Sequence, residues 1–219
     1  LSAGRPVPDT QRRHFPVSMV EKEPLLIIAC GALSHEIEAL KTMNGWSHIQ
    51  VQCLDAALHN RPQAIPEKLA KLIARNRDRY RQIFVAYADC GTAGEIDRVL
   101  DRDGIQRLPG AHCYSVFAGE KRFSELNDEE PGTFYLTDFL ARHFERLVVK
   151  GLKLDVHPEL RDDYFGNYQR VVYLSQIADE RSMAAAKSAA DFLGLAFAHK
   201  QCGYGDLEVS MRQQLIASA

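Results

Sequence analysis

Short apolar runs alternate with stretches of helical periodicity along most of this 219-residue chain. The apolar runs cover residues 25–29, 48–54, 83–88, 105–108, 171–174 and 195–198. Between most of them, apolar residues recur every three or four positions, as on one face of a helix. Strands that alternate with helices are typical of a parallel sheet with helices on both faces. We therefore predict a Rossmann-like α/β fold with one mostly parallel sheet of about five or six strands.

The chain is long enough for one large domain. Residues 1–23 contain Pro6, Pro8 and Pro16 and show no periodicity, which predicts a flexible N-terminal tail. Residues 24–219 are predicted to form a single α/β domain. Apolar residues recur at helical spacing over residues 134–150, and Pro158 opens a second helical stretch. These residues predict a helical insertion, 134–168, between strands four and five.

Charge and hydropathy exclude two classes of partner. The formal net charge is −2 and the basic residues are interspersed with acidic ones, so a nucleic-acid footprint is not indicated. No apolar stretch approaches the roughly 20 residues that a membrane span needs. The five cysteines, without a visible secretion signal, predict reduced thiols in a cytoplasmic protein.

Three of the cysteines lie where apolar runs end. Cys30 and Cys90 follow predicted strands, and Cys113 follows the short fourth run. Because the carboxyl ends of parallel strands share one edge of a sheet, thiols distant in sequence can meet there. Thiolates and imidazoles suit zinc and iron–sulfur clusters. We predict a metal site formed by Cys30, Cys90 and Cys113. His112 is expected to be a fourth ligand or a residue that supports one of the ligands. The alternative is that these cysteines are packed as small apolar residues, as Cys53 is expected to be within its strand.

The loops that follow the strands also predict a ligand site. Helix starts with exposed N–H groups and glycines can hold an anion, and would lower the pKa of nearby thiols. The candidate ligand-binding residues are Gly31, His59, Asp89, Gly91, Thr92 and Asp138. No Gly-x-Gly-x-x-Gly, Walker lysine or Gly-x-Ser-x-Gly motif is present, so neither a nucleotide site nor a serine hydrolase is favoured. No catalytic residue is assigned.

Several short segments occur in an order that resembles a known family. They are Ala29-Cys30-Gly31, Leu58-His59-Asn60, Asp89-Cys90-Gly91-Thr92, His112-Cys113-Tyr114, Phe117-Ala118-Gly119, Pro131-Gly132-Thr133 and Leu136-Thr137-Asp138-Phe139-Leu140. Together they resemble the family known as domain of unknown function 1638, from about residue 25 to residue 208. The resemblance implies an association with corrinoid-dependent methyl transfer, including cobalamin-dependent methionine synthesis. It implies corrinoid-dependent methyltransferase components as partners and carries over no catalytic residue.

These observations lead to one functional expectation and two alternatives. We expect a zinc or iron–sulfur protein that is an accessory to corrinoid-dependent methyl transfer. The first alternative is a metal-free protein that binds a corrinoid protein or a small anionic ligand. The second is a cysteine-dependent transferase or lyase in which Cys90 is the nucleophile.

Overall fold

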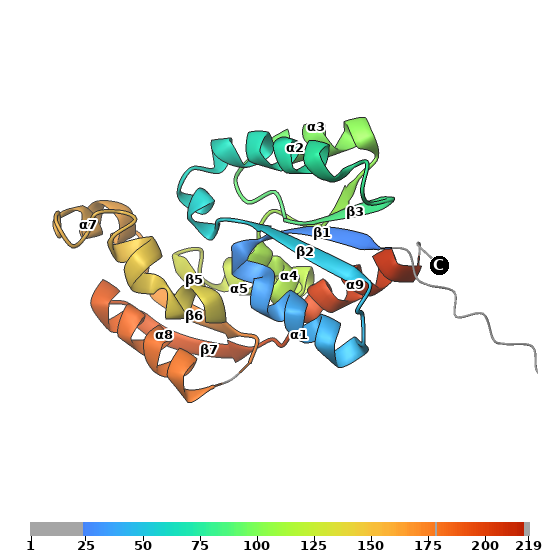
Figure 1. Cartoon of the computed structure of the whole chain (residues 1–219). Coiled ribbons are helices and arrows are strands. Elements are labelled where there is room, and N and C mark those ends of the chain that lie inside the picture. The colour runs from blue at the N-terminus through green and yellow to red at the C-terminus, as the bar shows by residue number, and fades with distance from the viewer. Residues whose placement is uncertain (1–23, 178, 217–219) are drawn as a thin grey trace, which may run out of the picture.

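The computed structural model of the protein describes residues 24–177 and 179–216, so the tail predicted for residues 1–23 lies outside the described residues. The described strands form two parallel sheets, whereas we predicted one (Figure 1). The first sheet has the order β2-β1-β3-β4, from Ile49–Leu54, Leu25–Cys30, Gln82–Ala86 and Gln106–Arg107. The second has the order β5-β6-β7, from Thr133–Thr137, Arg170–Ser175 and Ala196–Gln201.

Helices cover the sheets, which confirms the α/β class. In Figure 1, α2 and α3 lie on one face of the first sheet, and α1 and α9 lie on the other. None of the described helices has both the length and the apolar character needed to cross a bilayer. The α-helices are α1 Ser34–Asn44, α2 Ile65–Asn76, α3 Glu95–Leu100, α4 Cys113–Ala118, α5 Glu120–Glu129, α6 Asp138–Arg142, α7 Leu160–Phe165, α8 Glu180–Leu193 and α9 Gly205–Ile216.

We call the part of the molecule built on the first sheet the first half, and the part built on the second sheet the second half. Strand β1 is an inner strand of the first sheet. All six of its residues are buried, because it pairs in parallel with β2 on one side and β3 on the other. The register sets Cys30 opposite Leu54, and Ala29 opposite Ala86. Both neighbouring strands therefore end at the same edge as β1, as expected for a parallel sheet.

The prediction of a helix that begins at residue 134 is wrong for its first residues. Residues Thr133–Thr137 form β5, which pairs with β6. Aromatic and threonine side chains favour a strand there, and pairing with the mostly buried strand β6 outweighs the helical spacing. The Thr137 side chain then accepts a hydrogen bond from the backbone N–H of Leu140 and begins α6. Residues Glu145–Val149 continue as a π-helix. The predicted helical insertion over 134–168 thus starts the second sheet.

The last helix ties the two halves together. After β7, the chain returns to the first half as α9, which packs against α4. Leu207 and Met211 of α9 are almost completely buried in the core of the first sheet. The first half is therefore closed by a segment that follows the second sheet in sequence.

Asp138 joins the start of α6 to the loop that follows β6, at the carboxyl end of the second sheet. Its side chain is 2% exposed and accepts hydrogen bonds from the Tyr173 hydroxyl at 2.6 Å and from the backbone N–H groups of Gln176 and Ile177 at 3.1 and 2.7 Å. The Gln176 side chain in return accepts from the Asp138 backbone N–H at 3.0 Å. The carboxylate that the sequence predicted as ligand-binding thus joins α6 to the loop after β6.

We expect Asp138→Ala to lower the free energy of unfolding by about 3 kcal/mol or more. The change leaves three donors without their acceptor, and each buried unsatisfied group costs about 1–3 kcal/mol. Urea denaturation measures the loss. The control is Asp128→Ala on the exposed side of α5, where a change within about 0.5 kcal/mol is expected. Equal denaturation midpoints for the two variants would contradict the anchoring role.

Candidate functional site

The structure brings the three predicted cysteines together. Cys30 ends β1, Cys90 lies four residues beyond the end of β3, and Cys113 begins α4. Two backbone hydrogen bonds join the segment at Cys90 to the segment before Cys113: Asp89 N–H to Gly110 C=O at 3.1 Å, and Cys90 N–H to Ala111 C=O at 2.8 Å. The Cys90 thiol accepts from the backbone N–H of Cys113, and charges on the three sulfurs would interact pairwise. We call these three residues the thiol cluster.

His59 lies beside the thiol cluster. It belongs to a short 3₁₀ segment, Ala56–Asn60, that follows β2. Its Nδ1 is 3.8 Å from the Cys30 sulfur and 3.0 Å from the Ala56 carbonyl oxygen, and its ring stacks on Tyr87. Burial lowers the pKa of His59, so the ring is neutral at pH 7. With Nδ1 donating to Ala56, Nε2 carries the free lone pair.

His112 is placed differently from its predicted role. It precedes the first turn of α4, and its side chain is exposed, whereas Cys113 next to it is half-buried. Its carbonyl oxygen accepts from the Ser115 hydroxyl at 2.8 Å, which shapes the start of the helix. The imidazole that contacts a cluster thiol is therefore that of His59.

The expectation that the thiols are partly ionised is wrong for the metal-free protein. Burial raises the pKa of Cys30 to about 12, although the Ala32 N–H donates to its sulfur at 3.4 Å. Burial also raises the pKa of Cys90 to about 11 and that of Cys113 well above its usual value. Helix α3 begins only at Glu95, so its dipole does not act on Cys90. All three cluster thiols are neutral at pH 7.

The loop predicted to bind an anion is filled by its own carboxylate. Asp89 accepts hydrogen bonds from the Thr92 hydroxyl at 2.9 Å and from the backbone N–H groups of Ala93 and Gly94 at 3.1 and 2.8 Å. Burial alone would raise the pKa of Asp89, but these bonds outweigh it and hold the pKa below its usual value. The loop therefore satisfies its own donors and positions Cys90, whose φ of 50° is left-handed.

The two predicted glycines have different structural reasons, close packing at Gly31 and a left-handed backbone at Gly91. A Cβ added to Gly31 would lie 3.0 Å from the Leu54 carbonyl oxygen, so glycine lets the ends of β1 and β2 approach closely. Gly91 has a φ of 81°, which glycine adopts without strain. A Cβ there would lie 3.7 Å from Pro62, which is an ordinary contact, so the left-handed backbone and not crowding favours glycine. Neither glycine lies among the residues that line the pocket described next.

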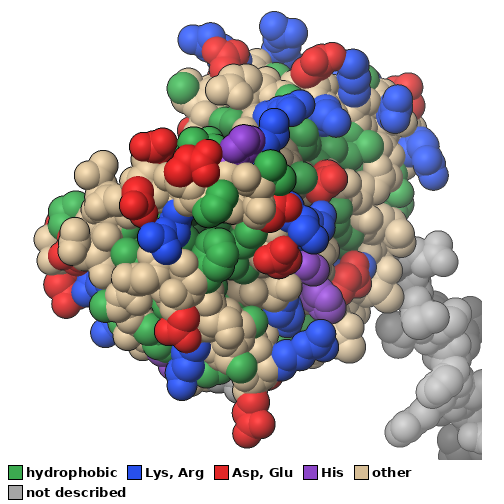
Figure 2. Space-filling view, turned by 90° about the vertical axis from the view of Figure 1, so that its left-hand side faces the viewer, with side chains coloured by type: hydrophobic (Ala, Val, Ile, Leu, Met, Phe, Trp, Pro, Cys, Tyr) green, Lys and Arg blue, Asp and Glu red, His purple; other side chains and the backbone are tan. Residues whose placement is uncertain are grey.

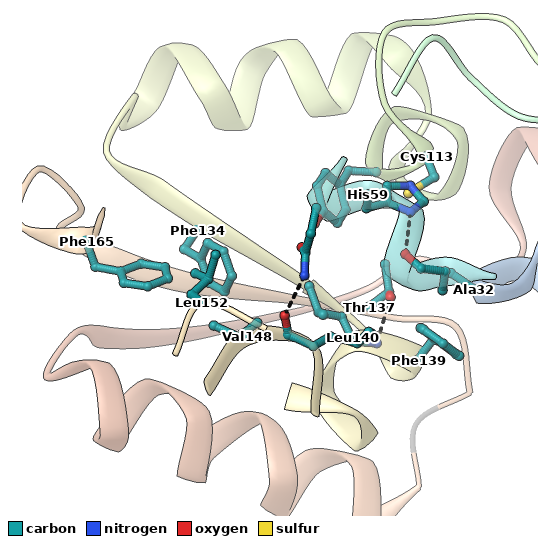
Figure 3. Close-up of a pocket in the computed structure, with 14 residues that line it drawn as sticks. Ala32, His59, Cys113, Phe134, Thr137, Phe139, Leu140, Val148, Leu152 and Phe165 are labelled. Carbon is teal, nitrogen blue, oxygen red and sulfur yellow. Dashed lines mark hydrogen bonds between the residues drawn. The ribbon is translucent and has the colours of Figure 1, made fainter. Parts of the chain in front are cut away.

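A mostly apolar pocket opens beside the thiol cluster. It has a volume of about 220 Å³ and lies between the two halves. His59 and Cys113 lie side by side at one end, and Phe165 lies at the other, with Phe134, Leu152 and Val148 between them (Figure 3). On the face drawn in Figure 2, hydrophobic side chains gather in a central hollow surrounded by charged ones. The molecule therefore places buried thiols and apolar surface side by side.

Sequence reasoning missed two buried polar groups near the site. The buried Tyr87 hydroxyl lies beside the Cys30 thiol, where it would lower the pKa of Cys30, but within the described residues it makes no hydrogen bond of ordinary geometry. Glu36 on α1 is 2% exposed, and burial raises the pKa of its carboxyl to about 7. Both occur within apolar periodic patterns that predict core or helix, so no sequence signal distinguished them.

No finished metal site is present in residues 24–177 and 179–216. Within them, no three His, Cys, Asp or Glu side chains already converge closely enough to hold an ion. The thiol cluster is therefore an assembly of neighbouring donors whose side chains would have to turn toward a common point.

The fold and the thiol cluster define an α/β protein of two parallel sheets with a buried sulfur site beside an apolar pocket. The chain belongs to the family of proteins of unknown function DUF1638, which it matches over residues 53–211. The match includes His59, Cys90 and Cys113 and begins after Cys30. No curated protein and no solved structure was found to match the chain.

We expect the cluster thiols to react slowly with iodoacetamide in metal-free protein at pH 7. Thiolate is the reacting form, and each unit by which the pKa is raised lowers its fraction about tenfold. Cys53, which we predicted to be packed in a strand, is exposed and serves as the internal reference. Mass spectrometry of the peptides should find Cys53 labelled before Cys90 at pH 7, with Cys90 labelling accelerating as the pH rises toward 11. Preferential labelling of Cys90 at neutral pH would contradict this and favour a nucleophilic cysteine.

Proposed function

We propose that the thiol cluster binds a soft metal ion and that the protein acts through this centre. The observation that carries the proposal is that Cys30, Cys90 and Cys113 come from three separate stretches of chain and lie on neighbouring segments, with His59 beside Cys30. Three thiolates and one imidazole are a donor set suited to zinc. The same three thiolates also suit an iron–sulfur cluster with one site left for a non-thiolate ligand.

His59 is the better candidate than His112 for the fourth ligand. It is neutral, its Nδ1–H is directed at the Ala56 carbonyl oxygen, and its Nε2 is free to bind an ion. A ligating histidine commonly donates its other N–H to a backbone carbonyl, which fixes the ring and its tautomer. The exposed His112 side chain has no comparable support.

The orphaned Tyr87 hydroxyl also supports a thiolate at Cys30. A buried hydroxyl without a partner costs about 1–3 kcal/mol. A neutral thiol is a weak acceptor, whereas a thiolate held by a metal is a strong one. Ionisation of Cys30 would thus give Tyr87 the acceptor that it lacks within the described residues. This pairing favours a metal centre over inert packing of the cysteine.

The wider context is proposed from the resemblance to corrinoid-associated proteins. We propose a cytoplasmic accessory of corrinoid-dependent methyl transfer, whose partners are corrinoid-dependent methyltransferase components. We further propose that the first half is Rossmann-like, because its strand order is β2-β1-β3-β4 with helices on both faces. The site at the carboxyl ends of β1 and β3 agrees with the usual position of ligands in such folds.

We expect Cys90→Ser to weaken zinc binding by well over about 100-fold, because loss of a mere supporting residue already costs 10–100-fold. A zinc titration against a colorimetric chelator measures the affinity. Cys53→Ser removes an exposed thiol that is not part of the cluster and should leave the affinity unchanged. Tyr87→Phe should weaken binding by about 10–100-fold.

The pH dependence gives an independent check of the same proposal. The cluster thiols are neutral at pH 7 without metal, so each thiol that binds zinc releases a proton. The apparent affinity should therefore rise with pH between 6 and 8, by up to about 1,000-fold per pH unit when three protons leave. A pH-independent affinity, or equal affinities of the Cys90→Ser and Cys53→Ser variants, would remove the proposal. Protein purified without oxygen distinguishes the metals, since an iron–sulfur cluster is coloured and zinc is not.

The proposed partner is tested separately with the full chain. Immobilised protein should retain a cobalt-containing fraction from a lysate of corrinoid-dependent methylotrophic cells. The cobalt content of that fraction is compared with that retained by an unrelated immobilised protein. Equal cobalt contents would reject the corrinoid context and leave the metal proposal standing.

A further inference from the structure

We infer that the pocket between the two halves binds a small neutral molecule with an apolar body and a hydroxyl head. The inference concerns the pocket alone and does not require an ion at the thiol cluster. It rests on the chemistry of the lining, the size of the cavity and the polar groups at one end.

The lining contains no charged side chain. Its walls are aromatic and aliphatic, including Phe134, Phe139, Leu140, Val148, Leu152 and Phe165. A charged ligand would lose its water there without gaining an opposite charge, which is strongly unfavourable. An apolar body gains about 25 cal/mol for each Å² of surface removed from water. The pocket therefore selects neutral ligands, in contrast to the anionic ligand considered from the sequence.

The size of the cavity limits the ligand. Its volume is about 220 Å³, below the roughly 300–1,000 Å³ of sites that take drug-sized molecules. The ligand is thus smaller than a nucleotide or a corrinoid. A short aliphatic chain or one aromatic ring fits this volume better than either.

The polar end provides both a donor and an acceptor. His59 Nε2 is an acceptor, because Nδ1 donates to Ala56. The Thr137 oxygen accepts from Leu140 N–H at 3.3 Å, so its own hydroxyl hydrogen remains available to donate. Both residues line the pocket. A hydroxyl that donates to His59 and accepts from Thr137 matches this pair.

The walls are held in place across the two halves without a ligand. The Asn60 side-chain amide donates to the Leu147 carbonyl oxygen at 3.2 Å and so links the segment after β2 to the π-helix. A Cβ on Gly151 would collide with that same carbonyl oxygen and with the Asn60 amide, so glycine is needed for the contact. A π-helix inside a helical segment is frequent at functional sites. The pocket is therefore preformed, which lowers the entropic cost of binding.

The test uses straight-chain primary alcohols from butanol to decanol, titrated by calorimetry into full-length protein in the presence of a metal chelator. Affinity should rise about fourfold for each added methylene until the pocket is full, and then stop rising. Carboxylates with the same number of carbons should bind at least about tenfold more weakly. Chain-length-independent binding, or equal affinity for alcohols and carboxylates, would overturn the inference.

Two substitutions at one lining position separate a binding effect from a folding effect. Leu152→Trp fills the cavity and should abolish alcohol binding, whereas Leu152→Ala enlarges it and should move the optimum to longer chains. Leu160→Trp is the control, because Leu160 packs against the same core outside the pocket lining. Unchanged chain-length preference in both Leu152 variants would reject this site. The chelator removes metal, so the alcohol titrations test the pocket alone. If alcohols do not bind, the zinc proposal still stands, and if zinc does not bind, the alcohol result still stands.

Discussion

The site depends on a short backbone pairing between residues 89–90 and 110–111. Parallel pairing of β1 with β3 alone would bring Cys30 near the segment of Cys90. Cys113 joins them because the two hydrogen bonds between these segments set the start of α4 at the same edge. The Asp89 carboxylate holds one side of this pairing by capping the loop that follows it. The pairing itself uses main-chain groups, so the fold sets the backbone positions of the three cysteines, while their side chains would still have to turn to meet at one point.

Burial gives the site its chemical character. Exclusion of water keeps the thiols protonated and His59 neutral, and the pocket beside them has no charged side chain in its lining. A soft ion would reverse this balance, because metal binding replaces protons and offers the thiolates a partner. The Tyr87 hydroxyl is already in place for that ionised state. The two proposals share one group, since each uses the free lone pair of His59 Nε2, so a bound metal ion and a bound hydroxyl would compete for it.

The pocket exists because elements of the second half lie opposite the edge of the first sheet. Had residues 134–150 formed one amphipathic helix, they would have covered the edge of the first sheet as a lid. As β5, the start of this segment builds a second layer instead, with α6 and the π-helix facing His59 and Asn60. Asp138 links α6 to the loop after β6 in that layer. Helix α9 returns to pack into the core around the first sheet. The pocket thus requires both halves.

The sequence alone determined the α/β class, most helix and strand positions, and that Cys30 and Cys90 lie just past the ends of neighbouring strands, because these follow from apolar periodicity and the shared edge of parallel strands. It also pointed to His59. It did not determine that Phe134 and Tyr135 lie in a strand, since their spacing also fits a helix and only the neighbouring β6 decides between the two. Nor did it determine the ionisation of the thiols, or the roles of Asp89 and Asp138 as internal acceptors. Those properties depend on solvent exclusion and on donors supplied by distant residues, which only the tertiary structure brings together.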